Sequence, residues 1–165
     1  MTEPLSEALG PPPFRFTPSQ GPEMQAAAFS PFFKAIACAL VLGLAVWFAR
    51  LWLDGKTPGG TVSIFTWFLA ALVMLLYTVW HIVRGVTTLD SQQIQQTWVW
   101  HKKMDLRELA YGKIIRVRGL EWLIAPRIYV RTLMGKFAVF YSADPRMLAE
   151  FERLVAELKD FRGFK

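Results

Sequence analysis

The sequence predicts an α+β membrane protein. In this fold a two-helix transmembrane hairpin is followed by a small antiparallel β domain with a C-terminal amphipathic helix. Two long apolar runs joined by a short polar connector indicate the hairpin. After the second run, apolar and polar residues alternate over several short segments, as they do in half-buried strands. Close to the C-terminus the period changes to that of an amphipathic helix.

The first apolar run, residues 32–53, is long enough to cross about 30 Å of hydrocarbon as a helix. Its charges, Lys34 and Arg50, lie near opposite ends, where long side chains can extend to the membrane interfaces. An interfacial helix lying in the membrane plane would need a charged face, which two distant charges do not make. We interpret the run as an uncleaved anchor, because no small-residue cleavage motif follows it.

The second apolar run, residues 62–83, contains no Asp, Glu, Lys or Arg. The connector, Asp54 to Thr61, is short and rich in turn residues, so the two spans should form a hairpin. More Lys and Arg residues follow the second span than lie beside the connector, which predicts that the chain after residue 84 is cytoplasmic. With an even number of spans, both termini are predicted to be cytoplasmic.

Four tryptophans lie where interfacial anchors are expected. Trp47, Trp52 and Trp67 fall toward the connector, and Trp80 falls toward the cytoplasmic side. We interpret them as anchors at the membrane interfaces. The single cysteine, Cys38, excludes an intrachain disulfide.

Residues 1–31 precede the first span and are rich in Pro, Gly and Ser. Such a composition predicts a flexible lead-in with polyproline II character. A proline-rich ligand for a partner domain is one alternative, and anchoring by Phe14 and Phe16 on a partner or on the bilayer is another. At the end of this tail, Ser30 is a plausible N-cap and Pro31 fits the first helical position.

Residues 85–165 are predicted to form the β domain. The segment 94–100 should be a strand in which Ile94, Gln96, Trp98 and Trp100 share one face. The following HKKMD is predicted to be a polar turn. Further strands are expected in IIRVRG, RIYVRTL and KFAVFYS, with MGK as a hairpin turn, which together suggest an antiparallel meander.

The final segment predicts a helix over about 145–160, with Asp144 as N-cap and Pro145 at its first position. Its apolar residues form one helical stripe and its charged residues lie outside that stripe. The members of the stripe are Met147, Leu148, Phe151, Leu154, Val155 and Leu158, and those outside it include Glu150, Glu152, Arg153 and Glu157.

The hairpin followed by TTLDSQQIQQ, LRELAYGKIIRVRG, RIYVRTLMGKFAVFY and a terminal helix resembles bacterial membrane proteins with a pleckstrin-homology-like domain. The connection GLEWLIAPR is longer and more apolar than that family's pattern. The resemblance implies a PH-like fold and a multi-pass protein of the bacterial cytoplasmic (inner) membrane. It also implies a binding or assembly role and no single activity, because a fold by itself does not specify a function.

Sequence motifs for catalysis, cofactors or metals were sought and not found. The chain has no HExxH, CxxC, GxGxxG or P-loop pattern, and its two histidines, His81 and His101, are far apart. We therefore expect a protein that is not an enzyme and that holds no cofactor and no metal.

Two functions remain for comparison. The first is an accessory, assembly or scaffold subunit, in which the hairpin, tail and β domain bind a protein partner within a membrane complex. The second is a module that binds anionic membrane lipids through the basic residues Arg84, Lys102, Lys103 and Arg107. These four residues are alternatively only a topology signal. Nucleic acid is not an expected partner, because the basic residues are spread over strands with few exposed aromatics among them.

Overall fold

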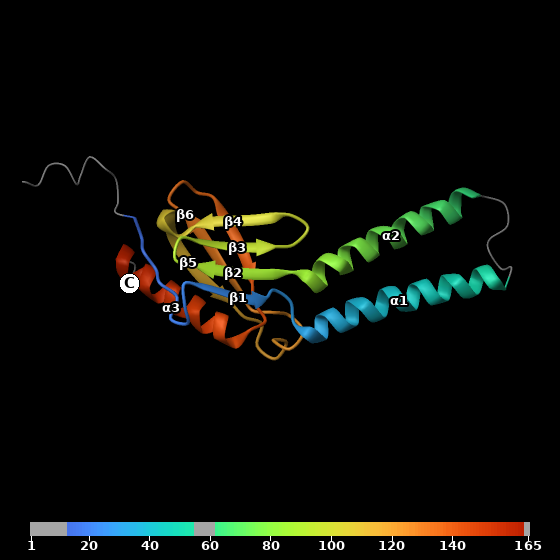
Figure 1. The fold of residues 1–165 in the computed structure, drawn as a ribbon, viewed down its shortest axis with the longest axis horizontal. Coiled ribbons are helices and arrows are strands. Elements are labelled where there is room, and N and C mark those ends of the chain that lie inside the picture. Colours follow the sequence, from blue (N-terminus) through green and yellow to red (C-terminus); the bar gives the residue numbers. More distant parts are fainter. Residues whose placement is uncertain (1–12, 55–61, 164–165) are drawn as a thin grey trace, which may run out of the picture.

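A computed structural model describes residues 13–54 and 62–163, so predictions for residues 1–12 and for most of the connector lie outside the described residues. Two long helices extend side by side from one end of a β domain (Figure 1). In chain order the elements are β1 (Glu23–Ala27), α1 (Pro31–Leu53), α2 (Val62–Arg84), β2 (Val86–Asp90), β3 (Gln93–Thr97), β4 (His101–Asp105), the 3-10 helix η2 (Leu106–Glu108), β5 (Leu109–Ile115), β6 (Arg127–Thr132), β7 (Phe137–Tyr141) and α3 (Pro145–Arg162).

The helical hairpin agrees with the prediction. Both α1 and α2 are long and apolar enough to cross a membrane, with mean hydropathies of 2.2 and 1.8. Only 6% of each apolar window is buried against the rest of the protein, so neither is the core helix of a soluble domain. As predicted, Pro31 opens α1 and the Ser30 hydroxyl caps it, accepting a hydrogen bond from Phe33 N at 3.1 Å. At the same end Lys34 Nζ donates to the carbonyl oxygen of Val83 at 2.9 Å, placing a cation on the C-terminus of α2.

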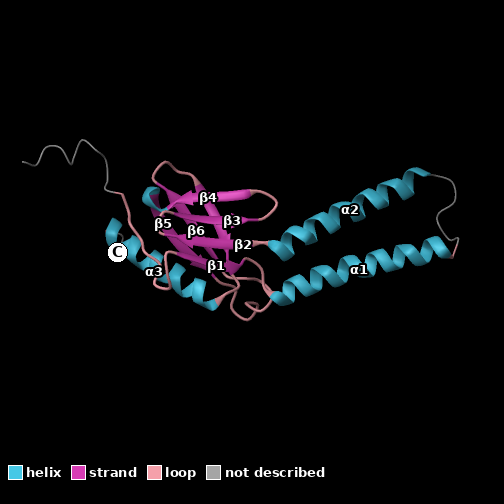
Figure 2. Ribbon diagram, viewed as in Figure 1, coloured by secondary structure: helices cyan, strands magenta, loops and turns pink. Residues whose placement is uncertain are grey.

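The strands of the described chain are antiparallel, as predicted, but they form two sheets instead of one meander. One sheet has the order β1-β2-β3-β4 and the other the order β5-β6-β7. Figure 2 shows α3 running along the domain beside these sheets. Gly112 allows α3 to approach β5 closely, because a Cβ there would lie 3.1 Å from Val155 Cγ2. The buried residues of the two sheets and α3 form one core.

The structure corrects the prediction of a flexible tail for residues 13–31. Glu23–Ala27 forms β1, which pairs antiparallel with β2 and covers an edge that would otherwise be unpaired. Met24 and Ala26 point into the core, at 8% and 6% exposed. Phe14 and Phe16 are each 2% exposed and belong to the same core. They are therefore core residues of this chain and are not available as anchors for a partner or a bilayer.

This pairing changes the domain boundaries. The chain leaves the first sheet after β1, passes through both helices and returns to the neighbouring position as β2 (Figure 1). The β domain consequently consists of residues 13–30 together with residues 85–163. The hairpin is an insertion into the domain, and the predicted unit 85–165 lacks one of its strands.

Two strand ends and one predicted turn also differ from the prediction. β3 ends at Thr97, so Trp98 and Trp100 lie in a turn, and the predicted turn HKKMD is strand β4. The physical reason is the pairing of Ile94 with Met104, which places Met104 in the core at 7% exposed. In the second sheet β5 ends at Ile115, so Val117 is not a strand residue.

The C-terminal helix begins as predicted, with Asp144 Oδ1 accepting from Arg146 N at 2.8 Å. It continues to Arg162 and stops at Gly163, whose φ of 68° is in the left-handed region. Glu150, which the helical pattern placed outside the apolar stripe, is only 5% exposed. It is buried because Ser19 donates to its carboxylate and Arg153 forms an ion pair with it at 3.1 Å.

Candidate functional site

The end of the β domain from which the helices leave, here called the helix-proximal end, is joined to them without a linker. Ala27 pairs with Val86 at this end of the first sheet, and Ala28 N donates to Gly85 O at 3.0 Å. Gly85 is packed so tightly that a Cβ would lie 3.1 Å from Phe29 Cε2 and 3.3 Å from His81 O. The paired strands β1 and β2 are therefore joined closely to the beginning of α1 and to the end of α2.

Phe29 connects both sheets to the first helix. Its ring lies 5.7 Å from that of Phe33 in α1, 6.0 Å from Trp98 after β3, and 5.9 Å from Tyr141 in β7. Aromatic pairs at these separations stabilise by about 0.5–1.5 kcal/mol each beyond their buried area. The orientation of the domain relative to the helices is therefore set by packing as well as by the backbone.

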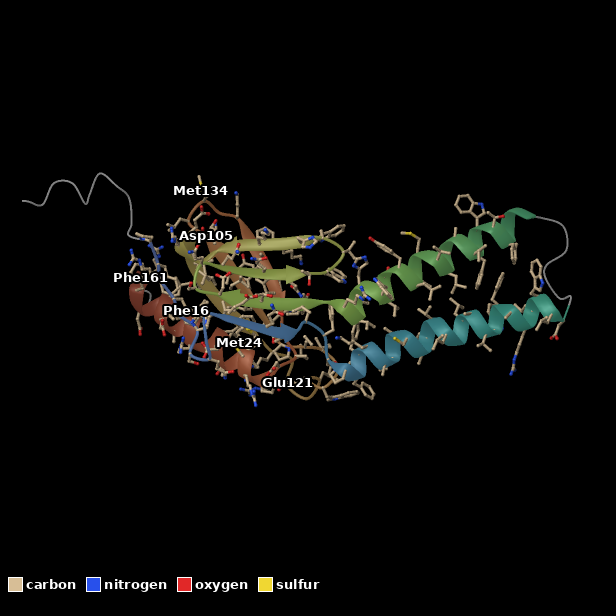
Figure 3. All side chains as sticks on the ribbon, in the orientation of Figure 1. Phe16, Met24, Asp105, Glu121, Met134 and Phe161 are labelled. Atoms are coloured by element: carbon tan, nitrogen blue, oxygen red, sulfur yellow. The ribbon has the colours of Figure 1, made fainter. Side chains whose placement is uncertain are left out.

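The apolar β5–β6 connection lies at the same end. The Ser30 hydroxyl donates to Leu123 O at 3.1 Å, and the Trp122 ring lies 4.6 Å from Phe32 at the start of α1. Figure 3 labels Glu121 of this connection beside the beginning of the helices. Several large apolar side chains remain exposed here, and we call them the base rim: Trp100 64%, Leu120 40%, Trp122 53% and Ile124 38%.

Two of the predicted membrane-contact residues lie at the helix-proximal end. The Arg84 guanidinium lies over the Trp80 ring at 3.9 Å, and Lys102 Nζ lies 5.8 Å from the Trp98 ring. Each contact holds a cation beside an aromatic ring, an arrangement worth about 0.5–1 kcal/mol at exposed sites. Lys102 is thus close to the base rim, because the Trp98 ring lies 6.4 Å from that of Trp100, and Arg84 ends α2 at the same end of the domain.

The other two predicted residues do not join them. Lys102 and Lys103 are neighbours on strand β4, so their side chains leave opposite faces of the sheet. Arg107 follows the far end of β4, where Leu106 N donates to Gln92 O at 2.8 Å. The two ends of β4 are four residue steps apart, roughly 13 Å. Asp105 marks this far end in Figure 3. The four basic residues therefore do not form one cluster.

The predicted tryptophan anchors lie at the two ends of the hairpin. Trp52 and Trp67 are near the connector, 56% and 75% exposed, and Trp47 is 55% exposed. Trp80 lies one helical turn from the β domain and is 55% exposed. Trp52 also contacts Phe65 of α2 at 4.6 Å, which helps to close the hairpin.

A second surface is formed by the outward-facing residues of the β5–β6–β7 sheet. It carries Tyr111, Lys113, Tyr129, Arg131 and Phe137, and we call it the aromatic-basic face. The alternation within each of these strands is visible in the sequence. The register that places the five side chains together is not.

An open groove of about 650 Å³ lies between β5, the β5–β6 connection and α3. It is lined by basic side chains, but Arg116 is paired with Glu152 across it. Within the described residues, no group of three or more His, Cys, Asp or Glu side chains is placed to hold a metal ion. The groove is thus a basic surface feature in which one of the cations, Arg116, is already paired.

Comparisons with protein-family models, with curated proteins and with solved structures find no match for this chain. Its functional assignment therefore depends on its own geometry.

Proposed function

We propose that this chain is a non-enzymatic accessory, assembly or scaffold subunit of a larger complex in the bacterial cytoplasmic membrane. The observation that carries the proposal is the insertion of the hairpin between the paired strands β1 and β2. Each helix is joined to a strand of the same ladder, so the domain is held in one orientation beside the helices. A fixed orientation suits a subunit that contacts membrane helices and a domain of its partner at once.

The arrangement of the domain supports a binding role. Sheets of four and three antiparallel strands with a terminal helix, as described for residues 13–30 and 85–163, are compatible with the PH-like fold. We assign that fold as part of the proposal. It supplies a rigid scaffold whose outer surfaces are free to bind partners.

The membrane topology is part of the same proposal. Residues 13–30 and 85–163 lie on the same side of the hairpin, because β1 and β2 are paired. The excess of Lys and Arg after the second span supports a cytoplasmic location for both. The exposed indoles of Trp100 and Trp122 would then enter the headgroup region, where amphipathic rings are favoured.

The test is chemical cross-linking in native membranes, followed by purification in mild detergent and native mass measurement. We expect a second protein at fixed stoichiometry, present with and without cross-linker. A chain that is recovered alone under both conditions, from membranes in which it is expressed at its natural level, would contradict the subunit role.

The second candidate function is recognition of anionic lipid. The observation that favours it is the pair of cation–ring contacts at the helix-proximal end, made by Arg84 and Lys102. Each basic side chain near an anionic surface contributes about 1 kcal/mol, so the pair would give roughly a thirtyfold preference.

The probe for this second candidate is a pair of brominated lipids that quench tryptophan fluorescence, one anionic and one zwitterionic, with the full chain in bilayers. Changing Arg84 and Lys102 to Gln should remove the preference for the anionic lipid. Changing Lys103 and Arg107 to Gln is the matched control and should leave the preference intact. Salt should weaken the preference, because exposed charges are screened over about 8 Å at physiological ionic strength. If both double variants keep the same preference for the anionic lipid, Arg84 and Lys102 have only a topological role.

A further inference from the structure

The aromatic-basic face is built by the register of three strands. Tyr111 pairs with Arg131, Arg131 pairs with Phe137, and Lys113 pairs with Tyr129, so the five side chains lie on one side of the sheet. The opposite side is the core, where Ile128, Val130 and Phe140 are fully buried. The face is therefore the side of the second sheet opposite the core, and Lys113 at its β5 edge also borders the groove beside α3.

The rings on this face contact one another. Tyr129 lies between Tyr111 and Phe137, with ring centroids 6.5 Å and 6.1 Å away. Phe137 remains 69% exposed, and the β6–β7 turn adds Met134 at 80% and Leu133 at 49%. Large apolar side chains exposed together on a rigid sheet indicate a contact surface more than a solvated one.

The charge of the face has one sign. Its strand positions carry Lys113 and Arg131 and no Asp or Glu. Neither cation forms an ion pair within the described part of the chain, whereas Arg116 and Arg153 do. An acidic partner could therefore pair with these two cations without breaking an existing ion pair.

The position of the face argues against the bilayer as its occupant. Tyr111, Arg131 and Phe137 lie toward the end of the second sheet that includes Leu109 and Thr132, away from the β5–β6 connection. Met134 of the adjoining turn is labelled in Figure 3 at the side of the domain far from the helices. A membrane crossed by α1 and α2 would lie beyond the opposite end of the domain.

We propose that the aromatic-basic face docks an acidic, partly apolar segment of a partner protein. This proposal rests on the proposed function and names the chemistry of the partner. Tyr, Phe, Met and Arg, which this face and its adjoining turn present, are residues enriched at the centres of protein interfaces. The packing of Tyr129 between two other rings uses ring surfaces that stacked nucleotide bases would need, which favours protein over nucleic acid. Arg131 and Phe137 are the expected energetic centre of the contact.

The test places a photo-crosslinking amino acid at Met134 of the full chain in native membranes and sequences the cross-linked segment. We expect one protein segment rich in Asp and Glu. In the same background, Arg131→Glu and Phe137→Ala should each reduce the cross-linking yield roughly tenfold. Arg118→Glu makes the same charge change on an exposed residue of the β5–β6 connection and is the control, expected to leave the yield unchanged.

Other outcomes would overturn the inference. These are cross-linking to nucleic acid or lipid, a segment without acidic residues, no cross-link at all, or a yield that Arg131→Glu does not lower. Arg131 and Phe137 are exposed, so both variants should remain folded, and unchanged protease resistance will verify this. If a stoichiometric partner is present but Met134 does not reach it, only this inference fails. If no partner exists, the proposed function fails as well.

Discussion

Replacing Phe16 with Ala would test whether the N-terminal segment belongs to the β domain. The Phe16 ring is 2% exposed and lies under the Arg153 guanidinium of α3 at 4.7 Å. Thr17 O accepts a hydrogen bond from Arg153, and Ser19 donates to Glu150. Removing the Phe16 ring should therefore weaken the contact between this segment and α3.

The expected cost follows from burial. Removing a fully buried Phe side chain costs about 3–5 kcal/mol, because the lost transfer free energy is joined by a cavity. The contact of the ring with the half-buried Arg153 guanidinium adds at least about 0.5–1 kcal/mol. We therefore expect a loss of about 4 kcal/mol in the free energy of unfolding, against a total of about 5–15 kcal/mol for a domain of this kind.

The assay is pulse proteolysis of the full chain in mild detergent across a urea series, in which the shift of the midpoint multiplied by the slope gives the change in free energy. Phe137→Ala is the matched control, because the same atoms are removed from a ring that is 69% exposed. It should lower the free energy of unfolding by no more than about 0.5–1.5 kcal/mol, because it removes the stacking on Tyr129 but no buried core contact. If Phe16→Ala behaves like this control, residues 13–22 are not part of the folded domain and the reasoning is refuted.

Three further variants test the packing in the same assay. Leu154→Asp should unfold the domain, because Leu154 is fully buried and an unpaired buried carboxylate costs several kcal/mol, whereas Ala156→Asp on the exposed side of α3 should be tolerated. Gly85→Val should cost about 1–3 kcal/mol through its contacts with Phe29 and His81, and wild-type stability would contradict the tight junction. Asp144→Ala should cost about 1 kcal/mol by removing the N-cap of α3, while Asp160→Ala near the other end of the helix should not destabilise, and equal losses would exclude capping as the cause.

The helices could be predicted from long apolar runs and from capping residues. Residues 32–53 and 62–83 are apolar on all sides over the length of a bilayer, and the structure forms α1 and α2 within one residue of those bounds. The capping residues Ser30 and Asp144 are local signals followed at once by Pro, and both act as predicted. These features involve only residues that are close together in the sequence, so they can be recognised without the fold.

Strand β1 was not predictable because its signal is weak and its partner is remote. The segment EMQAA has no β-branched or aromatic residue, and it pairs with β2 across both helices. The alternation of Phe14 with Phe16, and of Met24 with Ala26, was the available clue. Proline and glycine around these residues indicated a flexible chain instead, and tertiary packing overrode that composition.

The predicted turn at HKKMD was wrong for a similar reason. Placing HKKMD in a turn brought Lys102 and Lys103 to one loop, whereas the pairing of β3 with β4 makes it a strand. The base rim and the aromatic-basic face combine residues from separate connections and strands, so they depend on register and topology. The positions of the four tryptophans along the helices needed only residue counting, and their role as interfacial anchors stays a prediction.

The central claim is that the hairpin is inserted between two paired strands, and engineered disulfides test it most directly. Gln25 and Thr88 are register partners in β1 and β2, and residues directly opposite in an antiparallel pair have Cα atoms about 4.5–5.5 Å apart, within disulfide range. Replacing both with Cys in a Cys38→Ser background, and oxidising native membranes, should join the chain before the hairpin to the chain after it. The disulfide is detected when proteolysis in the connector leaves the two fragments linked.

The control pairs Gln25→Cys with Gln95→Cys on β3, the next strand of the sheet beyond β2, roughly 10 Å away. We expect the Gln25–Thr88 pair to cross-link rapidly and nearly completely, and the control pair slowly or not at all. Equal rates for the two pairs, or no cross-link in either, would contradict the inserted hairpin.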